Sequence, residues 1–260
     1  MALTLALTAV AVPSANPTEA ALANQIGDGT TRVHGAVTVI GDSVLQGSLA
    51  FGPTLVERLA EQGWGPIRAR AGVGYSTGIS SGTTEARSSY WIERWRQEGW
   101  DAPNVFVNLG ANDSGRCDAD LACARDAIMH LVDTIGPGHS IWWPQITRHP
   151  AYRHQADTWN LALRQIADER DDFVTWGWPQ AMAAGGFSSW GNTHLSVDGY
   201  RTRSQLMAHE FSADLVTAQR TGDDAPLPRA AGAVSGVVPI DPVRVIDTRT
   251  TLPSLPRAEW

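Results

Sequence analysis

The sequence predicts an α/β fold in which one parallel sheet lies between two layers of helices. Three observations lead to this prediction. Five short runs of β-branched and other apolar residues are expected to form strands. The segments between these runs carry apolar residues at helical spacing, and stretches rich in glycine and proline separate the two kinds of segment. Strands that alternate with helices in this way are typical of a parallel sheet covered on both faces.

In the first half of the chain, a polar lead-in over residues 24–35 precedes the elements. Short buried strands are expected where apolar runs end at a turn, at Val37–Ile40, Ile67–Ala71 and Asn104–Leu109. Helices are expected at Val44–Leu49, at Thr54–Gln62, where Pro53 suits a helix start, and at the Trp/Arg/Glu-rich segment Tyr90–Glu98. The glycine-rich turn 72–78 and the sequence Gly110-Ala111-Asn112-Asp113 follow the second and third strands.

In the second half, a helix is predicted from Leu121 because apolar residues recur at positions 121, 124, 128, 131 and 132. Further strands are expected at Ser140–Gln145 and Phe173–Trp176, with a helix at Ala151–Asp168 between them. A loop rich in glycine and serine, Ala183–Leu195, then carries His194, and a last helix runs from Ser196 to about Val216.

The five strands are predicted to form a flavodoxin-like three-layer sandwich with strand order 2-1-3-4-5. With right-handed crossovers between parallel strands, this order is the simplest layout. In it Ser43, Gly74 and Asn112 lie in the loops after strands one, two and three. These loops share the carboxyl edge of the sheet, where open α/β sheets bind their ligands.

Composition excludes some classes of partner. Of the 260 residues, 43% are apolar and 18% are charged, as in a globular protein with a core. The net charge of −7 argues against binding to nucleic acid or to an anionic membrane surface. No segment after the N-terminal apolar run is long and apolar enough to span a bilayer. We expect a monomer.

Four regions are predicted along the chain. Residues 1–23 resemble a signal peptide, because the uncharged apolar run 1–12 is followed by Ala21-Leu22-Ala23, a sequence like a cleavage site. The alternative is a buried N-terminal helix. Residues 24–218 are expected to form the main domain, and 219–235 a linker rich in Gly, Asp, Pro and Ala. Residues 236–260 are too few for their own core, so we expect the truncated start of a further module or a disordered tail.

Cys117 and Cys123 are predicted to form a local disulfide in a loop-like setting, as in an exported protein. A metal site there would need more ligands nearby. The other histidines show no ligand spacing: His34, His130, His139, His149, His154 and His209. We therefore expect neither a metal nor a cofactor.

Four separated sequence blocks resemble one family, the SGNH (GDSL-type) hydrolases. The blocks are Gly41-Asp42-Ser43, Gly74, Gly110-Ala111-Asn112-Asp113 and His194-Leu195-Ser196. Each is a weak signal alone, since Ser43 would otherwise be an ordinary helix cap and His194 an ordinary loop histidine. Together they occur in the family's order, over about residues 36–216. The Gly-x-Ser-x-Gly sequence of lipases is absent around Ser43, which disfavours the α/β-hydrolase fold.

The resemblance implies a role for each matching residue. Ser43 would be the nucleophile and His194 its general base. The backbone N–H groups of Ser43 and Gly74, with the side-chain amide of Asn112, would form the oxyanion hole. Asp42 and Asp113 are expected to brace their loops by hydrogen bonds rather than to contact substrate.

One position departs from the family pattern. An Asp usually stands three residues before the histidine, and here that residue is Gly191. Three groups could orient His194 instead. The first is a backbone carbonyl within residues 189–191, such as that of Trp190. The others are the Asn192 side chain and Asp198. We favour a Ser-His dyad with a backbone acceptor, since Asp198 fits a first-turn helix acid.

Tryptophans near the histidine loop allow two interpretations. Trp178 and Trp190 could form the wall of an acyl or sugar subsite, and the alternative for both is packing in the core. Packing in the core or at its edge is expected for Trp142, Trp143 and Trp176. Together with the leader-like N-terminus, the resemblance implies a secreted, extracellular or cell-wall-associated serine esterase. Its expected substrate is a small-molecule or polysaccharide-linked short-chain ester, with acetyl groups on carbohydrate as the natural case. The alternatives are acyl transfer to a glycan hydroxyl and a silent carbohydrate- or cell-wall-binding module.

Overall fold

The structure, a computed structural model, describes residues 25–26, 29–79, 83–185, 187, 189–190 and 193–220. The predicted leader 1–23 and everything after residue 220 lie outside these residues. The last helix runs to Arg220 and so includes the first two positions of the predicted linker.

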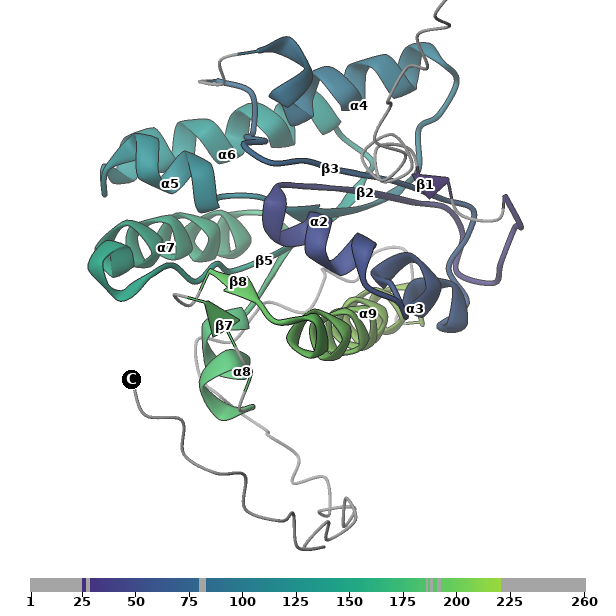
Figure 1. The fold of residues 1–260 in the computed structure, drawn as a ribbon. Helices are drawn as coiled ribbons and strands as arrows, with labels where there is room; N and C mark the ends of the chain where they lie inside the picture. The colour runs from purple at the N-terminus through teal and green to yellow at the C-terminus, as the bar shows by residue number, and fades with distance from the viewer. Residues whose placement is uncertain are drawn as a thin grey trace, which may run out of the picture. The chain divides into compact units, whose positions relative to one another are not determined.

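Five parallel strands form the sheet in the predicted order (Figure 1). The strands are β2 (Val37–Gly41), β3 (Ile67–Ala71), β4 (Asn104–Asn108), β5 (Ser140–Pro144) and β6 (Phe173–Trp176), arranged β3-β2-β4-β5-β6. Val39 at the centre of β2 pairs with Ala69 on one side and Phe106 on the other. The prediction of an α/β fold with strand order 2-1-3-4-5 is confirmed.

The structure adds a short sixth strand that the sequence did not indicate. β1 (Gln25–Ile26) pairs antiparallel with β3, within the segment predicted to be a polar lead-in. Two residues are too few to show the alternation that marks a strand, so only pairing with the edge of β3 identifies them.

The predicted helices are present with small shifts at their ends. They are α2 (Ser43–Ala50), α3 (Leu55–Glu61), α4 (Ser88–Gln97), α6 (Leu121–Ile135), α7 (Arg153–Glu169) and α9 (Val197–Arg220). Two 3₁₀ turns, Thr84–Ala86 and Pro150–Tyr152, precede α4 and α7. Thr54 begins α3 with a reciprocal capping box to Glu57.

Three elements were missed because they carry little periodic signal. α5 (Ala111–Cys117) is mostly polar with an internal glycine, so the predicted loop around the cysteines is in fact two helices joined at residues 118–120. α8 (Trp178–Ala184) had no predicted counterpart. The hairpin of β7 (Ser189–Trp190) and β8 (His194–Leu195) lies inside the predicted loop 183–195.

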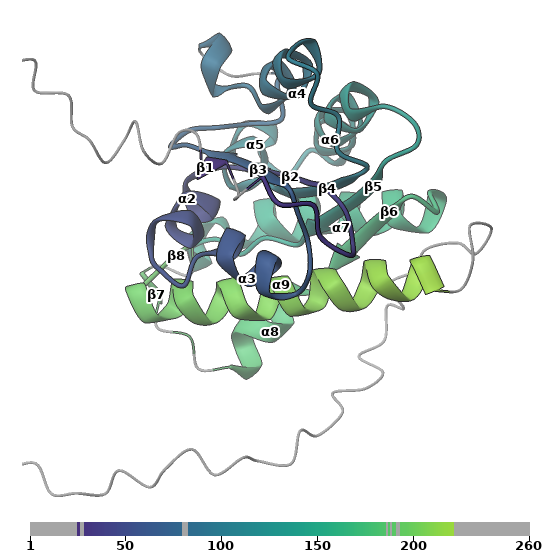
Figure 2. The same ribbon diagram turned by 90° about the vertical axis from the view of Figure 1, so that its right-hand side faces the viewer.

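Two apolar layers pack on opposite faces of the sheet (Figures 1 and 2). Val37 and Val39 of β2 face the cluster that includes α2, α3 and α9, whereas Ile40 faces the cluster that includes α4, α6 and α7. Four tryptophans have essentially no exposed surface: Trp64, Trp142, Trp143 and Trp159. The core interpretation therefore holds for Trp142 and Trp143, and the sheet that positions the loops is rigidly covered on both sides.

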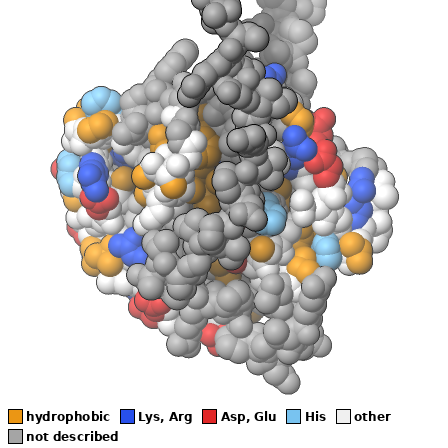
Figure 3. All heavy atoms as spheres, turned by 90° about the horizontal axis from the view of Figure 1, so that it is seen from below, with side chains coloured by type: hydrophobic (Ala, Val, Ile, Leu, Met, Phe, Trp, Pro, Cys, Tyr) orange, Lys and Arg blue, Asp and Glu red, His pale blue; other side chains and the backbone are white. Residues whose placement is uncertain are grey.

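Charged side chains are mixed on the face shown in Figure 3. There the described arginines and acidic residues are scattered between apolar and neutral side chains rather than gathered into one patch. Within the part of the chain that the structure describes, no helix has the length and apolar character needed to cross a membrane.

Candidate active site

Ser43 is the first residue of α2 and lies two positions after the end of β2, an interior strand of the sheet. Asp42 begins this helix, and its Oδ1 accepts a hydrogen bond from the Val44 N–H at 2.9 Å. Gly41 lets α2 lie close to the sheet, because a Cβ at this position would overlap the Asn108 carbonyl and the Leu45 side chain. The half-buried serine is therefore held at a fixed point on the carboxyl edge of the sheet.

His194 contacts Ser43 although the two residues are far apart in the sequence. Its Nε2 lies 3.0 Å from the Ser43 Oγ, across 151 positions of sequence. In the short β7–β8 hairpin, Trp190 is the register partner of His194, and buried Leu195 anchors the strand while His194 stays exposed. A histidine nitrogen at this distance can accept a hydroxyl proton, which is the arrangement that can activate a serine as a nucleophile.

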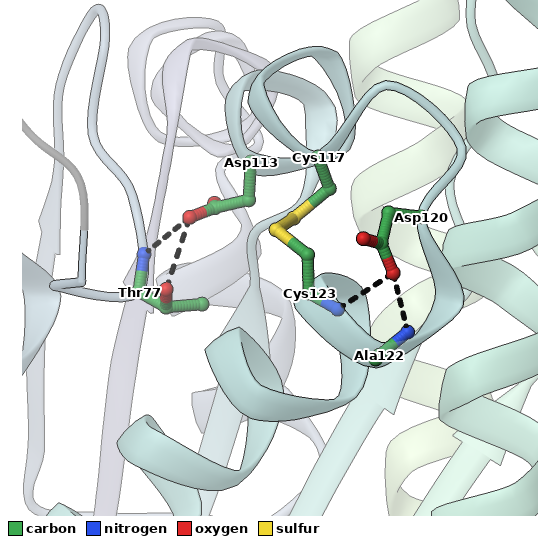
Figure 4. Close-up of a disulfide and its surroundings, with 6 residues drawn as sticks. All are labelled: Thr77, Asp113, Cys117, Asp120, Ala122 and Cys123. Atoms are coloured by element: carbon green, nitrogen blue, oxygen red, sulfur yellow. Dashed lines mark hydrogen bonds between the residues drawn. A yellow bond between two sulfur atoms is a disulfide. The ribbon is translucent and has the colours of Figure 1, made fainter.

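Helix α5 ties the loop after β3 to the loop after β4. The Asn112 Nδ2 donates to the Tyr75 carbonyl at 2.8 Å, so one of its two N–H groups is held and the other is left for a further acceptor. Asp113 accepts from the Thr77 N–H at 3.1 Å and from its hydroxyl at 2.9 Å (Figure 4). Asp42 and Asp113 thus brace their loops, as predicted.

Gly74 directly precedes Tyr75 in the loop after β3. Its φ of +76° lies in the region that favours glycine, and a Cβ there would meet no atom within 4 Å. Conformation, and not lack of space, is what favours glycine here.

The predicted disulfide between Cys117 and Cys123 is present. Figure 4 shows that it joins the end of α5 to the first turn of α6, close to the Asp113–Thr77 contact. Asp120 begins α6 and accepts from the N–H groups of Ala122 and Cys123 at 2.8 and 3.1 Å. The cross-link therefore fixes the helix that carries Asn112.

Two ionisable side chains are buried near the start of α2. Asp42 and Arg203 are each only 1% exposed. Burial raises the pKa of Asp42 to about 7, although the Val44 N–H and the charge of Arg203 oppose this shift. Burial likewise lowers the pKa of Arg203 to about 10. The neutral form of Asp42 is therefore accessible near physiological pH.

Sequence reasoning missed Arg203. Its guanidinium donates to the Ser48 Oγ at 3.1 Å and to the Asn108 Oδ1, and it lies 4.9 Å from the Trp178 ring centroid. A signal was available, because Arg203 interrupts a stripe of α9 residues that are buried at helical spacing, such as Tyr200 and Met207.

The remaining predicted site residues lie in different surroundings. Trp178 is 3% exposed and packs against Arg203 and Phe187, which is the core alternative for this residue. The side chain of Asp198 is 89% exposed and forms an ion pair with Arg201 at 2.9 Å. This surface ion pair argues against a role for Asp198 as the triad acid.

The other candidates for orienting His194 stay predictions. Gly191 and Asn192 lie outside the described residues, as does the Trp190 side chain. Among the residues that the structure describes, no group of three or more His, Cys, Asp or Glu side chains is arranged to hold a metal ion.

A parallel α/β sheet that carries a serine bonded to a histidine at its carboxyl edge is typical of serine hydrolases and acyl-transfer enzymes. Comparison with protein families gives the family to which the chain belongs. Residues 39–202 match the GDSL-like lipase/acylhydrolase family, and the chain belongs to this family. A search of curated proteins found no match.

Solved structures of similar fold agree with this assignment. The catalytic domain of a Streptococcus pneumoniae peptidoglycan O-acetyltransferase has a TM-score of 0.53 at 15% identity, covering 75% of this chain and 96% of that one. A G-D-S-L lipolytic protein from Veillonella parvula gives 0.54 at 17% identity, with 68% and 97% covered. A carbohydrate acetylesterase from Sinorhizobium meliloti gives 0.53 at 14% identity, with 68% and 98% covered. At these identities the likeness is one of fold.

Proposed function

We propose that this protein is a serine esterase that hydrolyses short-chain carboxylic esters through an acyl-enzyme. The observation that carries the proposal is the 3.0 Å contact between the Ser43 Oγ and the His194 Nε2. Two residues so far apart in sequence meet with the one geometry that general-base activation of a hydroxyl requires. Membership of the acylhydrolase family supports the same reaction class.

In the proposed reaction, the Ser43 Oγ attacks the ester carbonyl while its proton passes to the His194 Nε2. The tetrahedral intermediate collapses as the bond to the alcohol oxygen breaks, and that oxygen takes the proton back from His194. Water then attacks the acyl-enzyme by the same steps in reverse order, which releases the acid and restores Ser43.

The oxyanion of the intermediate would be stabilised by three neutral donors: the N–H groups of Ser43 and Gly74 and the Asn112 amide. The bond from Asn112 to the Tyr75 carbonyl supports this role, because it fixes the amide plane and leaves one N–H unused. Donors held in place before the reaction need no reorganisation when the charge develops.

We propose a Ser-His dyad in which a backbone carbonyl within residues 189–191 accepts the His194 Nδ1 proton, with Asn192 as the alternative. The outward ion pair of Asp198 with Arg201 supports this choice. A carbonyl fixes the imidazole tautomer, although it stabilises the imidazolium less than a carboxylate would.

An acetyl group on a carbohydrate is the natural substrate we propose, in an extracellular or cell-wall setting. The contact between Ser43 and His194 is exposed, so an ester attached to a polymer could reach it. The disulfide and the signal-peptide-like leader support secretion. A wall formed by Trp190 and a monomeric state remain predictions.

The test compares hydrolysis of p-nitrophenyl acetate and its longer homologues by wild type, Ser43→Ala and His194→Ala. We expect both variants to lose turnover, and the double variant to lose little more, because the two residues act as a unit. His154→Ala, at an exposed position of α7, is the matched control and should keep full activity. Equal rates for wild type and Ser43→Ala would reject the esterase.

The alternatives give distinct results in the same assay. An acyltransferase would release p-nitrophenol faster when a glycan acceptor is added, and the acetylated glycan would accumulate. A silent binding module would hold a glycan with unchanged affinity after Ser43→Ala and would hydrolyse nothing.

A further inference from the structure

Arg148 is a half-buried cation in the segment between β5 and the 3₁₀ turn Pro150–Tyr152. Its Nη1 donates to the Ser114 Oγ at 3.3 Å and to the Gln155 Oε1 at 2.5 Å. Burial lowers the pKa of this guanidinium. Among the described residues, no carboxylate oxygen lies within ion-pair distance of it, and its Nε and Nη2 make no hydrogen bond. A partly desolvated charge without a counter-ion is unusual in a folded protein.

The arrangement around Arg148 separates it from the nearby acidic residue. Gln155 accepts from Arg148 through its Oε1 and donates through its Nε2 to the Asp118 carboxylate at 2.9 Å. A neutral amide therefore stands between the cation and the anion. By contrast, Arg153 in the next helix pairs directly with Asp157 at 3.5 Å.

Gly115 makes room for this guanidinium on α5. A Cβ at position 115 would lie 2.8 Å from the Arg148 Nη1 and 3.4 Å from its Nη2, so a side chain there would displace it. Glycine destabilises the interior of a helix, so its presence at position 115 is explained by the space that it leaves for the guanidinium. Residues 112 and 115 are three apart on the helix and so lie on one face, about 5–6 Å apart at Cβ. The Arg148 guanidinium thus lies against a residue that is one helical turn from Asn112.

We propose that Arg148 binds a carboxylate group of the ester substrate, so that the preferred substrate is an ester of an acidic molecule such as a sugar acid. This inference rests on the proposed esterase function, since it places the carboxylate beside the same site. The Nε and Nη2 of a guanidinium form a planar fork that matches the two oxygens of a carboxylate. The Tyr152 ring, 5.1 Å from the guanidinium carbon, covers one face and leaves this edge free.

The experiment compares two esters that differ in one charge, 4-acetoxybenzoate and neutral 4-acetoxybenzamide. For the wild type we expect kcat/KM to favour the carboxylate by about tenfold or more. Arg148→Gln should bring the ratio close to one while kcat/KM for the neutral ester stays within about twofold of wild type. Arg148→Lys, which keeps the charge but not the fork, should retain part of the preference. Arg153→Gln is the matched control and should leave the ratio unchanged.

Two results would overturn the inference: no preference for the carboxylate in the wild type, or an equal loss on both esters after Arg148→Gln, which would make Arg148 structural. If wild type hydrolyses neither ester, the esterase proposal has failed instead. Calorimetric binding of 4-acetoxybenzoate to wild type and Arg148→Gln then decides the role of Arg148 on its own, with equal or absent binding counting against it.

Discussion

Replacing Asn112 by alanine separates a catalytic role of its side chain from a structural one. In the structure one N–H of the amide is bonded to the Tyr75 carbonyl at 2.8 Å. Loss of that bond should lower the free energy of unfolding by only about 1 kcal/mol, the net value of an ordinary hydrogen bond. The domain would stay folded at 25 °C, since small domains have about 5–15 kcal/mol of stability.

The catalytic effect should be much larger than the structural one. If the second N–H stabilises the oxyanion, its loss removes about 2.7–4 kcal/mol of transition-state stabilisation, and kcat falls by roughly 10²–10³-fold. KM should change little, because the ground-state carbonyl carries little charge. Steady-state hydrolysis of p-nitrophenyl acetate gives kcat and KM, and urea unfolding gives the stability of the same sample.

Gly74→Ala is the control for disturbance of the loop. The substitution keeps the backbone N–H, meets no atom within 4 Å and strains only the backbone at φ +76°. That strain costs about 1–2 kcal/mol of stability. We expect activity within about tenfold of wild type. A kcat for Asn112→Ala within threefold of wild type would refute the oxyanion role, and equal losses in both variants would assign the effect to loop geometry.

Three further predictions follow from the surroundings of the site. Asp198→Ala should leave turnover close to wild type, because its carboxylate is 89% exposed; a loss of about 10⁴-fold would identify it as a triad acid. Removing the disulfide by the double substitution Cys117→Ser/Cys123→Ser should lower the free energy of unfolding by about 2 kcal/mol, as expected for a short closed loop, measured by urea denaturation. Unchanged stability would contradict this. Because burial raises the pKa of Asp42 from 3.8 to about 7, the wild type should lose stability as pH rises between these values. Between pH 4.5 and pH 7.5, the free energy of unfolding should fall by about 1 kcal/mol or more less in Asp42→Asn than in the wild type. An equal fall in the two proteins would contradict this prediction.

Much of the site could be predicted because its parts follow strand ends. Ser43, Gly74 and Asn112 each lie in the loop or turn that follows a predicted strand, and a parallel sheet brings such positions to one edge whatever the intervening sequence. The loop-bracing roles of Asp42 and Asp113 were predictable for the same reason. The surroundings of Arg148 could not be predicted, because a linear sequence does not show whether a charged residue will have an ion-pair partner.

The sequence by itself determined the fold class and the strand order. Those features depend on local periodicity and on the right-handed crossover, which are written into short stretches of chain. Tertiary structure alone decided the helix α5, the burial of Arg203 beside Asp42 and the room that Gly115 leaves for Arg148. A polar seven-residue helix has little periodic signal, because contacts between distant segments stabilise it. The buried stripe of α9 that includes Arg203 does not show which distant groups the guanidinium meets.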